Sequence, residues 1–313
     1  MHTRPLGHSG LHVSTVGLGC NNFGARLDQD ATTAVVRRAL DRGITFFDTA
    51  DVYGNRGGSE VMLGRALGAE RSDVILASKF GLPMDDTGER QGAKPAYVRS
   101  ALEASLKRLG TDHLDLYQLH RPDPLTPIEE TLGALDELVR EGLVRFVGVS
   151  NMPAADVRAA DEAATRLNAA RFTSCQDEYS LLVRDIERDL IPAMRSRGLG
   201  LLPFFPLASG LLSGKYHAGQ PLPEGSRITG SEGAQNRYLT ERNWRVVEEL
   251  REFARARERT LLELAFSWLL AQDVTSSVIA GATRPEQIDQ NVSAAEWQLT
   301  PDELAEVNRI TST

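Results

Sequence analysis

The sequence is poor in cysteine: its 313 residues include two, Cys20 and Cys175. Two cysteines cannot build the disulfide framework of a small secreted domain, and these two do not have metal-ligand spacing. A chain of this length buries enough apolar surface to fold without disulfides or a structural metal. We therefore expect two buried thiols beside strands, with no chemical role and no metal site.

Long apolar runs are missing as well. The most apolar run, Leu261–Leu270, is too short to cross a bilayer, and it contains Glu263. No order of basic, apolar and small residues opens the chain, so a secretory signal is not expected. The sequence therefore predicts a cytoplasmic protein that does not enter a membrane.

A concentrated positive patch is also absent from the sequence. Asp and Glu outnumber Lys and Arg by 43 to 35, which gives a formal net charge of -8. Such a charge repels nucleic acid and anionic lipid, and we expect neither as a partner. The arginines between Arg251 and Arg259 alternate with Glu252 and Glu258, a pattern typical of a solvated helix face.

The sequence is rich in an alternation of short apolar runs and amphipathic stretches. The apolar runs predict eight strands, at Val16–Gly19, Thr45–Asp48, Val74–Lys79, Leu114–Leu119, Val144–Ser150, Ser174–Tyr179, Gly200–Phe204 and Ser277–Ile279. The stretches between them predict helices, among them Ala31–Arg42, Ser59–Leu67, Tyr97–Leu109 and Pro127–Glu141. Eight such units indicate a parallel sheet with helices outside it.

A closed barrel and a doubly wound open sheet both have this alternation. The open sheet would need a G-x-G-x-x-G loop after the first strand, and Gly17, Gly19 and Gly24 do not form one. We therefore predict an α/β fold, a (β/α)8 TIM barrel in which residues 1–313 form a single domain.

Three additions to the barrel are expected. A hairpin over Arg4–Val13 is placed to plug one end, and helices at Asn243–Arg257 and Pro301–Ile310 lie near the C-terminus. The connections Gly81–Lys94 and Leu207–Thr240 are long, rich in Gly and Pro, and of the kind that forms lids or binding loops.

Polar side chains stand where the predicted strands end. Asp48 ends one strand, Lys79 ends the next and His120 follows the one after, with Tyr53 five residues beyond Asp48. Taken singly, each has an ordinary explanation as a turn residue, a surface lysine, a structural histidine or a packed tyrosine. The carboxyl ends of barrel strands meet at one rim, where active sites of this fold are built, so their convergence favours one site.

These four residues support one kind of chemistry. A phenol with a pKa near 10 is a poor acid at neutral pH, and a neighbouring ammonium such as Lys79 lowers that pKa. Asp48 would hold Lys79, and His120 could orient a substrate oxygen while Tyr53 protonates it. No Ser or Cys is placed as a nucleophile, so the reaction needs a hydride from a cofactor.

Seven segments resemble motifs of the aldo-keto reductases, and together they span nearly the whole chain. They are FFDTADVYGNRGGSE (Phe46–Glu60), LASKFG (Leu76–Gly81), DLYQLHRPDP (Asp115–Pro124), VGVSNM (Val147–Met152), QDEYSLL (Gln176–Leu182), PFFPLASGLLSGKY (Pro203–Tyr216) and IAGATRPEQIDQNV (Ile279–Val292). The resemblance implies an oxidoreductase that reduces small aldehydes or ketones with NADPH. It makes Tyr53 the general acid, Lys79 and Asp48 its tuning pair, and His120 the residue that orients the carbonyl.

The resemblance also implies a cofactor site. It places Ser150, Asn151 and Gln176 on the nicotinamide carboxamide, with Phe204 stacked on the ring. The residues that it places along the pyrophosphate are Pro206, Leu207, Ser209, Gly210, Leu211, Ser213, Lys215 and Arg227. Those that it places at the adenosine end are Gly281, Thr283, Arg284, Gln287 and Asn291.

The adenosine end departs from the better-known mammalian-type reductases, because Gln287 replaces an arginine and Gly281 a lysine. Arg284 is the cation left for a 2′-phosphate, which favours NADPH and leaves NADH open.

The cofactor motifs also resemble those of potassium-channel β subunits, so a second hypothesis is an NADPH-binding regulatory subunit that acts on a protein partner. Those subunits carry asparagine where this chain has His120, which favours the enzyme.

The sequence does not identify the substrate or decide between a monomer and a homo-oligomer. Five apolar residues of the rim loops have two alternative roles, either to line a substrate pocket or to pack the loops against the barrel. They are Phe23, Leu82, Pro83, Met84 and Tyr238.

Overall fold

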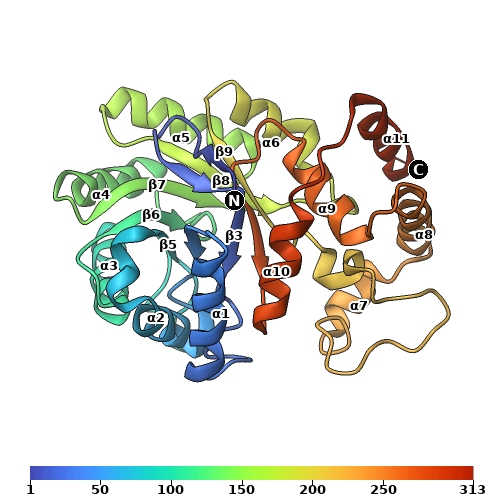
Figure 1. The fold of residues 1–313 in the computed structure, drawn as a ribbon. Coiled ribbons are helices and arrows are strands. Elements are labelled where there is room, and N and C mark those ends of the chain that lie inside the picture. The colour runs from blue at the N-terminus through green and yellow to red at the C-terminus, as the bar shows by residue number, and fades with distance from the viewer. Residues whose placement is uncertain (313) are drawn as a thin grey trace.

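The computed structural model describes residues 1–312, and its centre is a sheet of eight parallel strands (Figure 1). In sheet order they are β10 (Val278–Gly281), β3 (Val16–Gly19), β4 (Phe46–Asp48), β5 (Ile75–Phe80), β6 (Leu114–Leu119), β7 (Val144–Ser150), β8 (Phe172–Glu178) and β9 (Gly200–Phe204). The sheet closes where the Leu201 N–H donates to the Val274 carbonyl at 2.7 Å and the Ser276 N–H donates to the Leu201 carbonyl at 2.9 Å. The predicted (β/α)8 barrel is confirmed.

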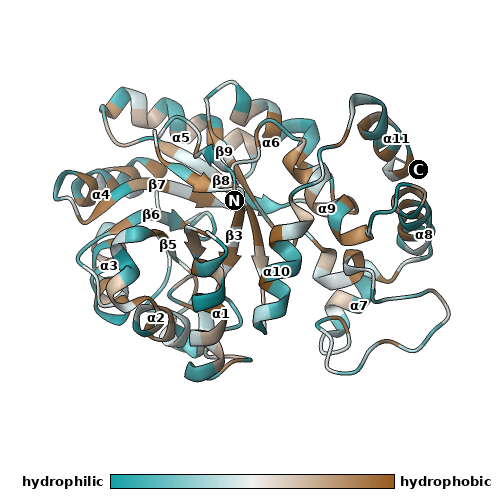
Figure 2. Ribbon diagram, in the orientation of Figure 1, coloured by the Kyte–Doolittle hydropathy of each residue, from teal (hydrophilic) through white to brown (hydrophobic). Residues whose placement is uncertain are grey.

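One helix follows each strand of the barrel and covers the outside of the sheet. These helices are α1 (Gln29–Asp41), α2 (Tyr53–Leu67), α3 (Pro95–Leu109), α4 (Ile128–Arg140), α5 (Ala154–Leu167), α6 (Ile186–Arg195), α9 (Leu261–Leu270) and α10 (Pro285–Ala294). Their apolar residues face the sheet and their polar residues face outward (Figure 2). No helix in residues 1–312 is long and apolar enough to cross a membrane.

The remaining helices gather on one side of the barrel, at the right of Figure 1. They are α7 (Glu232–Tyr238), α8 (Glu241–Arg255) and α11 (Pro301–Thr311), with the short 3-10 helix η2 (Ala208–Ser213) against α7. A second 3-10 helix, η1 (Gly68–Asp73), follows α2. Helix α7 and η2 lie inside the long connection predicted at Leu207–Thr240.

Helix α2 begins at Tyr53, before the predicted start at Ser59, but its first turns are irregular. Gly54, Asn55, Arg56 and Gly57 all have positive φ. A Cβ on Gly54 would lie 2.4 Å from the Phe23 carbonyl oxygen, so only glycine fits there. The regular helix therefore starts close to its predicted position, and the irregular turns fix the backbone beside Tyr53.

The N-terminal hairpin plugs the end of the barrel, as predicted. Strands β1 (Thr3–Pro5) and β2 (His12–Ser14) pair antiparallel. Leu6, Leu11 and Val13 join a buried cluster that also includes barrel residues Phe46, Ala77, Leu116, Leu202 and Ile279. A packed plug at this end leaves the opposite rim as the open one.

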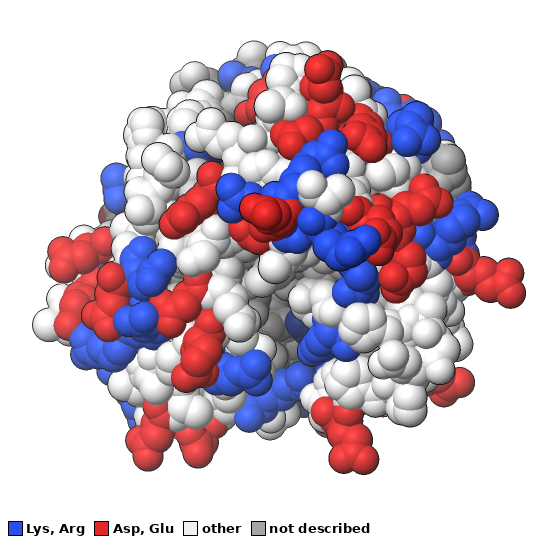
Figure 3. Space-filling model, turned by 45° about the vertical axis from the view of Figure 1, so that its right-hand side comes forward, with Lys and Arg blue, Asp and Glu red and all other residues white. Residues whose placement is uncertain are grey.

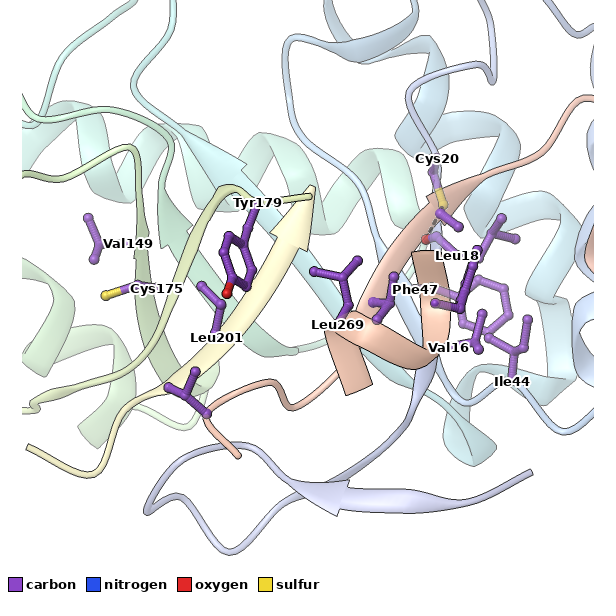
Figure 4. Close-up of a cluster of buried hydrophobic side chains, with 14 of the residues drawn as sticks. Val16, Leu18, Cys20, Ile44, Phe47, Val149, Cys175, Tyr179, Leu201 and Leu269 are labelled. Atoms are coloured by element: carbon purple, nitrogen blue, oxygen red, sulfur yellow. Dashed lines mark hydrogen bonds between the residues drawn. The ribbon is translucent and has the colours of Figure 1, made fainter. Parts of the chain in front are cut away.

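Both cysteines are free and buried, as expected. Figure 4 shows Cys20 beside Leu18 and Phe47, and Cys175 beside Val149, in separate parts of the apolar core. Burial raises the pKa of both thiols well above the usual value. Both thiols are therefore protonated and chemically inert at neutral pH.

The arginines of α8 and of the turn after it are more than a solvated face, which corrects the prediction. Arg251 donates hydrogen bonds to the carbonyl oxygens of Gly214 at 3.0 Å and Tyr216 at 2.6 Å. Arg257 pairs with Glu303 and Glu306 of α11, at 3.0 and 3.1 Å. Charge alternation predicts exposure, but here two of the arginines tie α8 to the long connection and to the C-terminal helix.

Asp177 on β8 generates a prediction about stability. Its Oδ2 has no hydrogen-bond partner among residues 1–312, and burial raises the pKa of its carboxyl group to about 8. Between about pH 4 and pH 8 the folded chain therefore keeps a proton that the unfolded chain loses, so the free energy of unfolding falls as pH rises. Asp177→Asn should gain stability relative to wild type between pH 5 and pH 8, by at least about 1 kcal/mol in urea titrations.

The exposed Asp41 provides the matched control. Asp41→Asn should change the free energy of unfolding by the same amount at pH 5 and at pH 8. If the difference in free energy of unfolding between Asp177→Asn and wild type is the same at pH 5 and pH 8, the pKa of Asp177 is not raised.

Candidate active site

A buried ion pair occupies the centre of the open rim. Lys79, at the end of β5, is 0% exposed, and its Nζ donates to Asp48 Oδ2 of β4 at 2.7 Å and to the Thr49 carbonyl at 2.9 Å. The other carboxylate oxygen, Oδ1, accepts hydrogen bonds from Gln118 Nε2 and Gln176 Nε2, each at 3.0 Å. Buried charges are tolerated when they are paired and hydrogen-bonded, and both conditions hold here.

The pairing keeps Lys79 charged. Burial by itself would lower the pKa of this ammonium, but the neighbouring Asp48 and Tyr53 outweigh it, and the pKa is raised. A positive charge therefore stands in a water-poor site, where it acts strongly on its neighbours.

Tyr53 lies over this charge, with Lys79 Nζ 5.0 Å from the centre of its ring. Burial raises the pKa of the phenol, while the charge of Lys79 and its hydrogen bonding lower it, and the balance is a raised pKa. The expected influence of Lys79 is present, but it is smaller than the effect of burial. The phenol therefore keeps its proton at neutral pH and can donate it.

His120, directly after β6, packs edge-on against Tyr53, with ring centres 5.6 Å apart at 84°. Burial, then the charges of Lys79 and Arg121, lower the pKa of its imidazole to about 2. Its backbone N–H donates to the Phe80 carbonyl at 2.9 Å, and its Nδ1 has no hydrogen-bond partner among the described residues. The ring is therefore neutral and offers a polar group beside the tyrosine hydroxyl.

The ends of β7 and β8 connect to His120 through their polar residues. Ser150 Oγ donates to the Gln176 carbonyl at 2.8 Å. Asn151 Nδ2 donates to the His120 carbonyl at 3.2 Å and to Ser150 Oγ at 2.9 Å. Asn151 has φ 56, a left-handed conformation that asparagine adopts more readily than most residues. The strand ends thus present amide and hydroxyl groups next to the tyrosine.

A cavity of about 520 Å³ opens above these residues. Asp48, Tyr53 and His120 line it, whereas Lys79 lies outside the lining. The predicted cofactor residues that line it are Ser150, Asn151, Gln176, Phe204, Pro206, Leu207, Ser209, Gly210, Ser213, Lys215, Arg227, Gly281, Thr283, Arg284 and Gln287. Leu211 and Asn291 are not among the lining residues, because Leu211 is buried in the core and Asn291 is buried within α10.

The predicted apolar substrate residues do not line this cavity. Phe23, Met84 and Tyr238 are buried in packing contacts, and Leu82 and Pro83 also lie outside the cavity wall. Of the two alternatives, the structure favours loop packing for Phe23, Met84 and Tyr238, whereas Leu82 is half-buried and Pro83 is exposed.

Several residues of the wall were not identified in the sequence, among them Cys20, Arg26, Phe205 and Glu224. Asn22 lies in the loop after β3 and donates to the Ala282 carbonyl at 3.2 Å, which joins this loop to the end of β10. Such loop residues have no periodicity that could reveal them. The one available signal is closeness in sequence to a strand end, which is β3 for Cys20 and β9 for Phe205.

Backbone strain is concentrated where β9 enters the long connection. Phe205, Ala208 and Ser209 have φ of 50, 45 and 57, in the left-handed region that residues with side chains rarely adopt. The rings of Phe204 and Phe205 meet edge to face, 5.2 Å between centres. Strained residues of this kind cluster at ligand sites, and these border the cavity.

Positive charge predominates among the loop side chains of the cavity wall. Arg26, Lys215, Arg227 and Arg284 line it, against one acidic side chain on the loops, Glu224. Figure 3 shows Lys and Arg side chains at the rim of a hollow on this side of the molecule. The residues fit a ligand with phosphate groups at one end and a flat amide-bearing ring at the other. Among residues 1–312, no cluster of three His, Cys, Asp or Glu is arranged to hold a metal ion.

Comparison with known proteins shows the family to which the chain belongs. The model of the family described as "Aldo/keto reductase family" matches residues 15–312. The chain is 35% identical over 309 residues to "Probable aldo-keto reductase 1" of Glycine max, covering 96% of this chain and 86% of that protein. It is also 35% identical over 325 aligned positions to "Putative voltage-gated potassium channel subunit beta" of Schizosaccharomyces pombe (strain 972 / ATCC 24843), covering 98% and 92%. The chain belongs to the aldo/keto reductase family and is, by that membership, an oxidoreductase.

Proposed function

We propose that this protein reduces aldehydes or ketones to alcohols with NADPH, and that Asp48, Tyr53, Lys79 and His120 carry the reaction. The observation that supports it is the buried Asp48–Lys79 pair at 2.7 Å beneath a protonated tyrosine and beside a neutral histidine. This set of groups protonates an oxygen and contains no nucleophile, which is what a carbonyl reduction requires of the protein.

Each of the four residues has a distinct role. His120 donates an N–H to the carbonyl oxygen of the substrate and fixes its direction toward Tyr53. The Tyr53 hydroxyl transfers its proton to that oxygen, and the charge of Lys79 stabilises the phenolate that remains. Asp48 keeps Lys79 charged and in place. The nicotinamide ring, when bound, supplies the hydride to the carbonyl carbon.

The cofactor would lie along the cavity from the strand ends to α10. Ser150, Asn151 and Gln176 offer hydrogen bonds to the carboxamide, and Phe204 offers a face to the ring. Lys215 and Arg227 also line the cavity and offer positive charge to a pyrophosphate.

At the far end, the N-terminus of α10 provides an anion site. Gln287 Oε1 accepts hydrogen bonds from the Thr283 backbone N–H at 2.7 Å and from Thr283 Oγ1 at 3.1 Å, so this turn is fixed without a ligand. Arg284 is exposed beside it, and Glu286 at 3.8 Å is its partner there. An exposed guanidinium next to a fixed turn suits a 2′-phosphate, which supports NADPH.

A second candidate is an NADPH-binding regulatory subunit that acts on a protein partner. The similarity to the Schizosaccharomyces pombe protein supports it. Both candidates need the same cofactor site, so turnover separates them.

Tyr53→Phe tests the assigned acid. The variant keeps the ring and loses the hydroxyl, so turnover of aldehydes should fall below about one-hundredth of wild type. NADPH affinity should stay within about twofold, because the hydroxyl serves proton transfer. The measurement is NADPH consumption against aromatic aldehydes, aliphatic aldehydes and diketones, with a parallel binding titration.

Tyr97→Phe makes the same chemical change in α3, outside the cavity lining, and should leave turnover intact. A Tyr53→Phe variant that turns over near wild-type rates would show that another group is the acid. If wild type binds NADPH tightly yet consumes none with any carbonyl, the regulatory candidate is supported.

Arg284→Ala tests the choice of cofactor. Loss of the guanidinium should weaken NADPH binding by about tenfold and leave NADH binding within about twofold, because only NADPH has the 2′-phosphate. Dissociation constants for both nucleotides are measured by fluorescence titration, with Arg309→Ala on the exposed face of α11 as the charge-matched control. Equal weakening for both nucleotides would remove Arg284 from 2′-phosphate recognition.

A further inference from the structure

A third buried carboxyl group lies behind the Asp48–Lys79 pair without a cation of its own. Asp51 follows β4 on the turn that leads to Tyr53, and it is 1% exposed. Among the described residues it makes no ion pair, and no side chain donates a hydrogen bond to either of its carboxyl oxygens. A buried charge without a partner is costly, so the uncharged, protonated form of Asp51 is favoured.

Both cations that face Asp51 already have partners. Arg108 Nε of α3 donates to Glu60 Oε2 at 2.6 Å, and Lys79 belongs to the ion pair at the rim. The other carboxylate oxygen of Glu60 accepts a hydrogen bond from Ser78 Oγ at 2.5 Å, next to Lys79 on β5. Three buried carboxyl groups thus share two cations, and Asp51 is the one left without.

The backbone of Asp51 joins the turn that carries Tyr53 to the strand that carries Lys79. The Asp51 N–H donates to the Lys79 carbonyl at 3.1 Å, and the Tyr53 N–H donates to the Ala50 carbonyl at 3.2 Å. A displacement of Asp51 therefore moves Tyr53 relative to Lys79. A shift of about 1 Å in a reacting group can slow a reaction by about a hundredfold.

The charges around Asp51 favour its protonated form. Burial, and next the negative charge of Glu60, raise the pKa of its carboxyl group to about 7, although Arg108 and Lys79 oppose them. The titratable groups that face it come from α2, α3, β5 and β6, and they are Glu60, Tyr97, Arg108, Lys79 and Tyr117. Burial raises the pKa of both phenols, so these two add no charge at neutral pH.

Four other titratable groups in or beside the cavity do not change charge near neutral pH. The pKa of His120 is lowered to about 2, and the pKa values of Tyr53, Lys79 and Cys20 are raised. Compared with these four groups, Asp51 is the one that exchanges its proton near pH 7.

We propose that Asp51 is a positioning residue, which holds the Tyr53 turn in place while it is protonated and displaces that turn when it is ionised. The role rests on the proposed carbonyl reduction. The ionised carboxylate is repelled by Glu60 and attracted by Lys79, so the turn shifts and the charge of Lys79 is partly neutralised. Both effects disfavour proton transfer from Tyr53, because the phenolate that forms depends on that cation. Reduction is therefore faster when Asp51 is protonated.

The test measures the rate of hydride transfer at pH 6 and at pH 8, by stopped-flow absorbance of NADPH in single turnovers with saturating aldehyde. The wild-type rate should fall by at least about threefold between these pH values. Asp51→Asn keeps the shape of the protonated side chain and cannot ionise. Its rate should match wild type within about twofold at pH 6 and exceed it by at least about threefold at pH 8. Asp51→Glu restores a carboxyl group and should restore a rate that falls with pH.

Asp177→Asn is the matched control. It makes the same change at a second buried carboxyl group, outside the cavity lining, whose pKa is raised to about 8 by burial. This variant should keep the wild-type dependence of rate on pH. Dissociation constants for NADPH should agree within about twofold for all variants at both pH values, because Asp51 also lies outside the cavity lining.

A merely structural role for Asp51 would change the rate by the same factor at both pH values, and that result overturns the proposal while the proposed function stands. A wild-type rate that is equal at pH 6 and pH 8 overturns it as well, without any variant. Asp51→Ser supplies a second neutral side chain if the asparagine variant does not fold. Wild type that reduces no carbonyl at either pH overturns the proposed function, and the role of Asp51 with it.

Discussion

The Asp48–Lys79 ion pair is the interaction on which the rest of the site depends. Lys79 is fully buried, and a lone ammonium there would be forced to lose its proton. Asp48 prevents this, and it is held in turn by Gln118 and Gln176 from β6 and β8. Removing one partner of such a pair costs about 3–5 kcal/mol, because the other is left charged and alone. Side chains from three strands are therefore fixed around the carboxylate of a fourth, and Tyr53 and His120 rest on that arrangement.

The strands and the catalytic side chains at their ends could be predicted from the sequence, because barrel strands end at a common rim. Asp48, Lys79 and His120 each stand at or just after a strand end, and the position of a strand can be found from its apolar run. The bounds of β3, β6, β7 and β9 were predicted residue for residue for the same reason. Arg26 could not be found in this way, since it follows its strand by several residues and its position depends on how the loop turns. The exclusion of Leu211 and Asn291 from the wall also depends on side-chain direction, which a motif does not record.

The long connection after β9 is positioned by residues that are far away in sequence. Glu178 at the end of β8 accepts hydrogen bonds from Arg237, at 2.5 Å, and from the Tyr238 hydroxyl, which fixes α7 above the rim. Arg251 of α8 binds the carbonyl groups of Gly214 and Tyr216 near the other end of the connection. The charge pattern of α8 suggested a solvated surface, because a sequence cannot show which arginines meet backbone carbonyls. The connection is thus braced near Gly214 and near Tyr238, and the strained residues Phe205 and Ser209 lie between β9 and the first of these braces.

Two opposing effects on the pKa of Tyr53 determine when this residue releases its proton. Burial raises the pKa of its phenol, and a site built on burial alone would hold the proton too firmly to transfer it. Lys79 opposes burial most strongly once the proton has left, because its charge then faces a phenolate in a water-poor cavity. His120, neutral because burial and two cations suppress its protonation, adds a hydrogen-bonding group without adding a charge that would compete with Lys79. The site thus holds the proton in the resting state and stabilises its loss during transfer, and this difference between the two states is the property that lowers a reaction barrier.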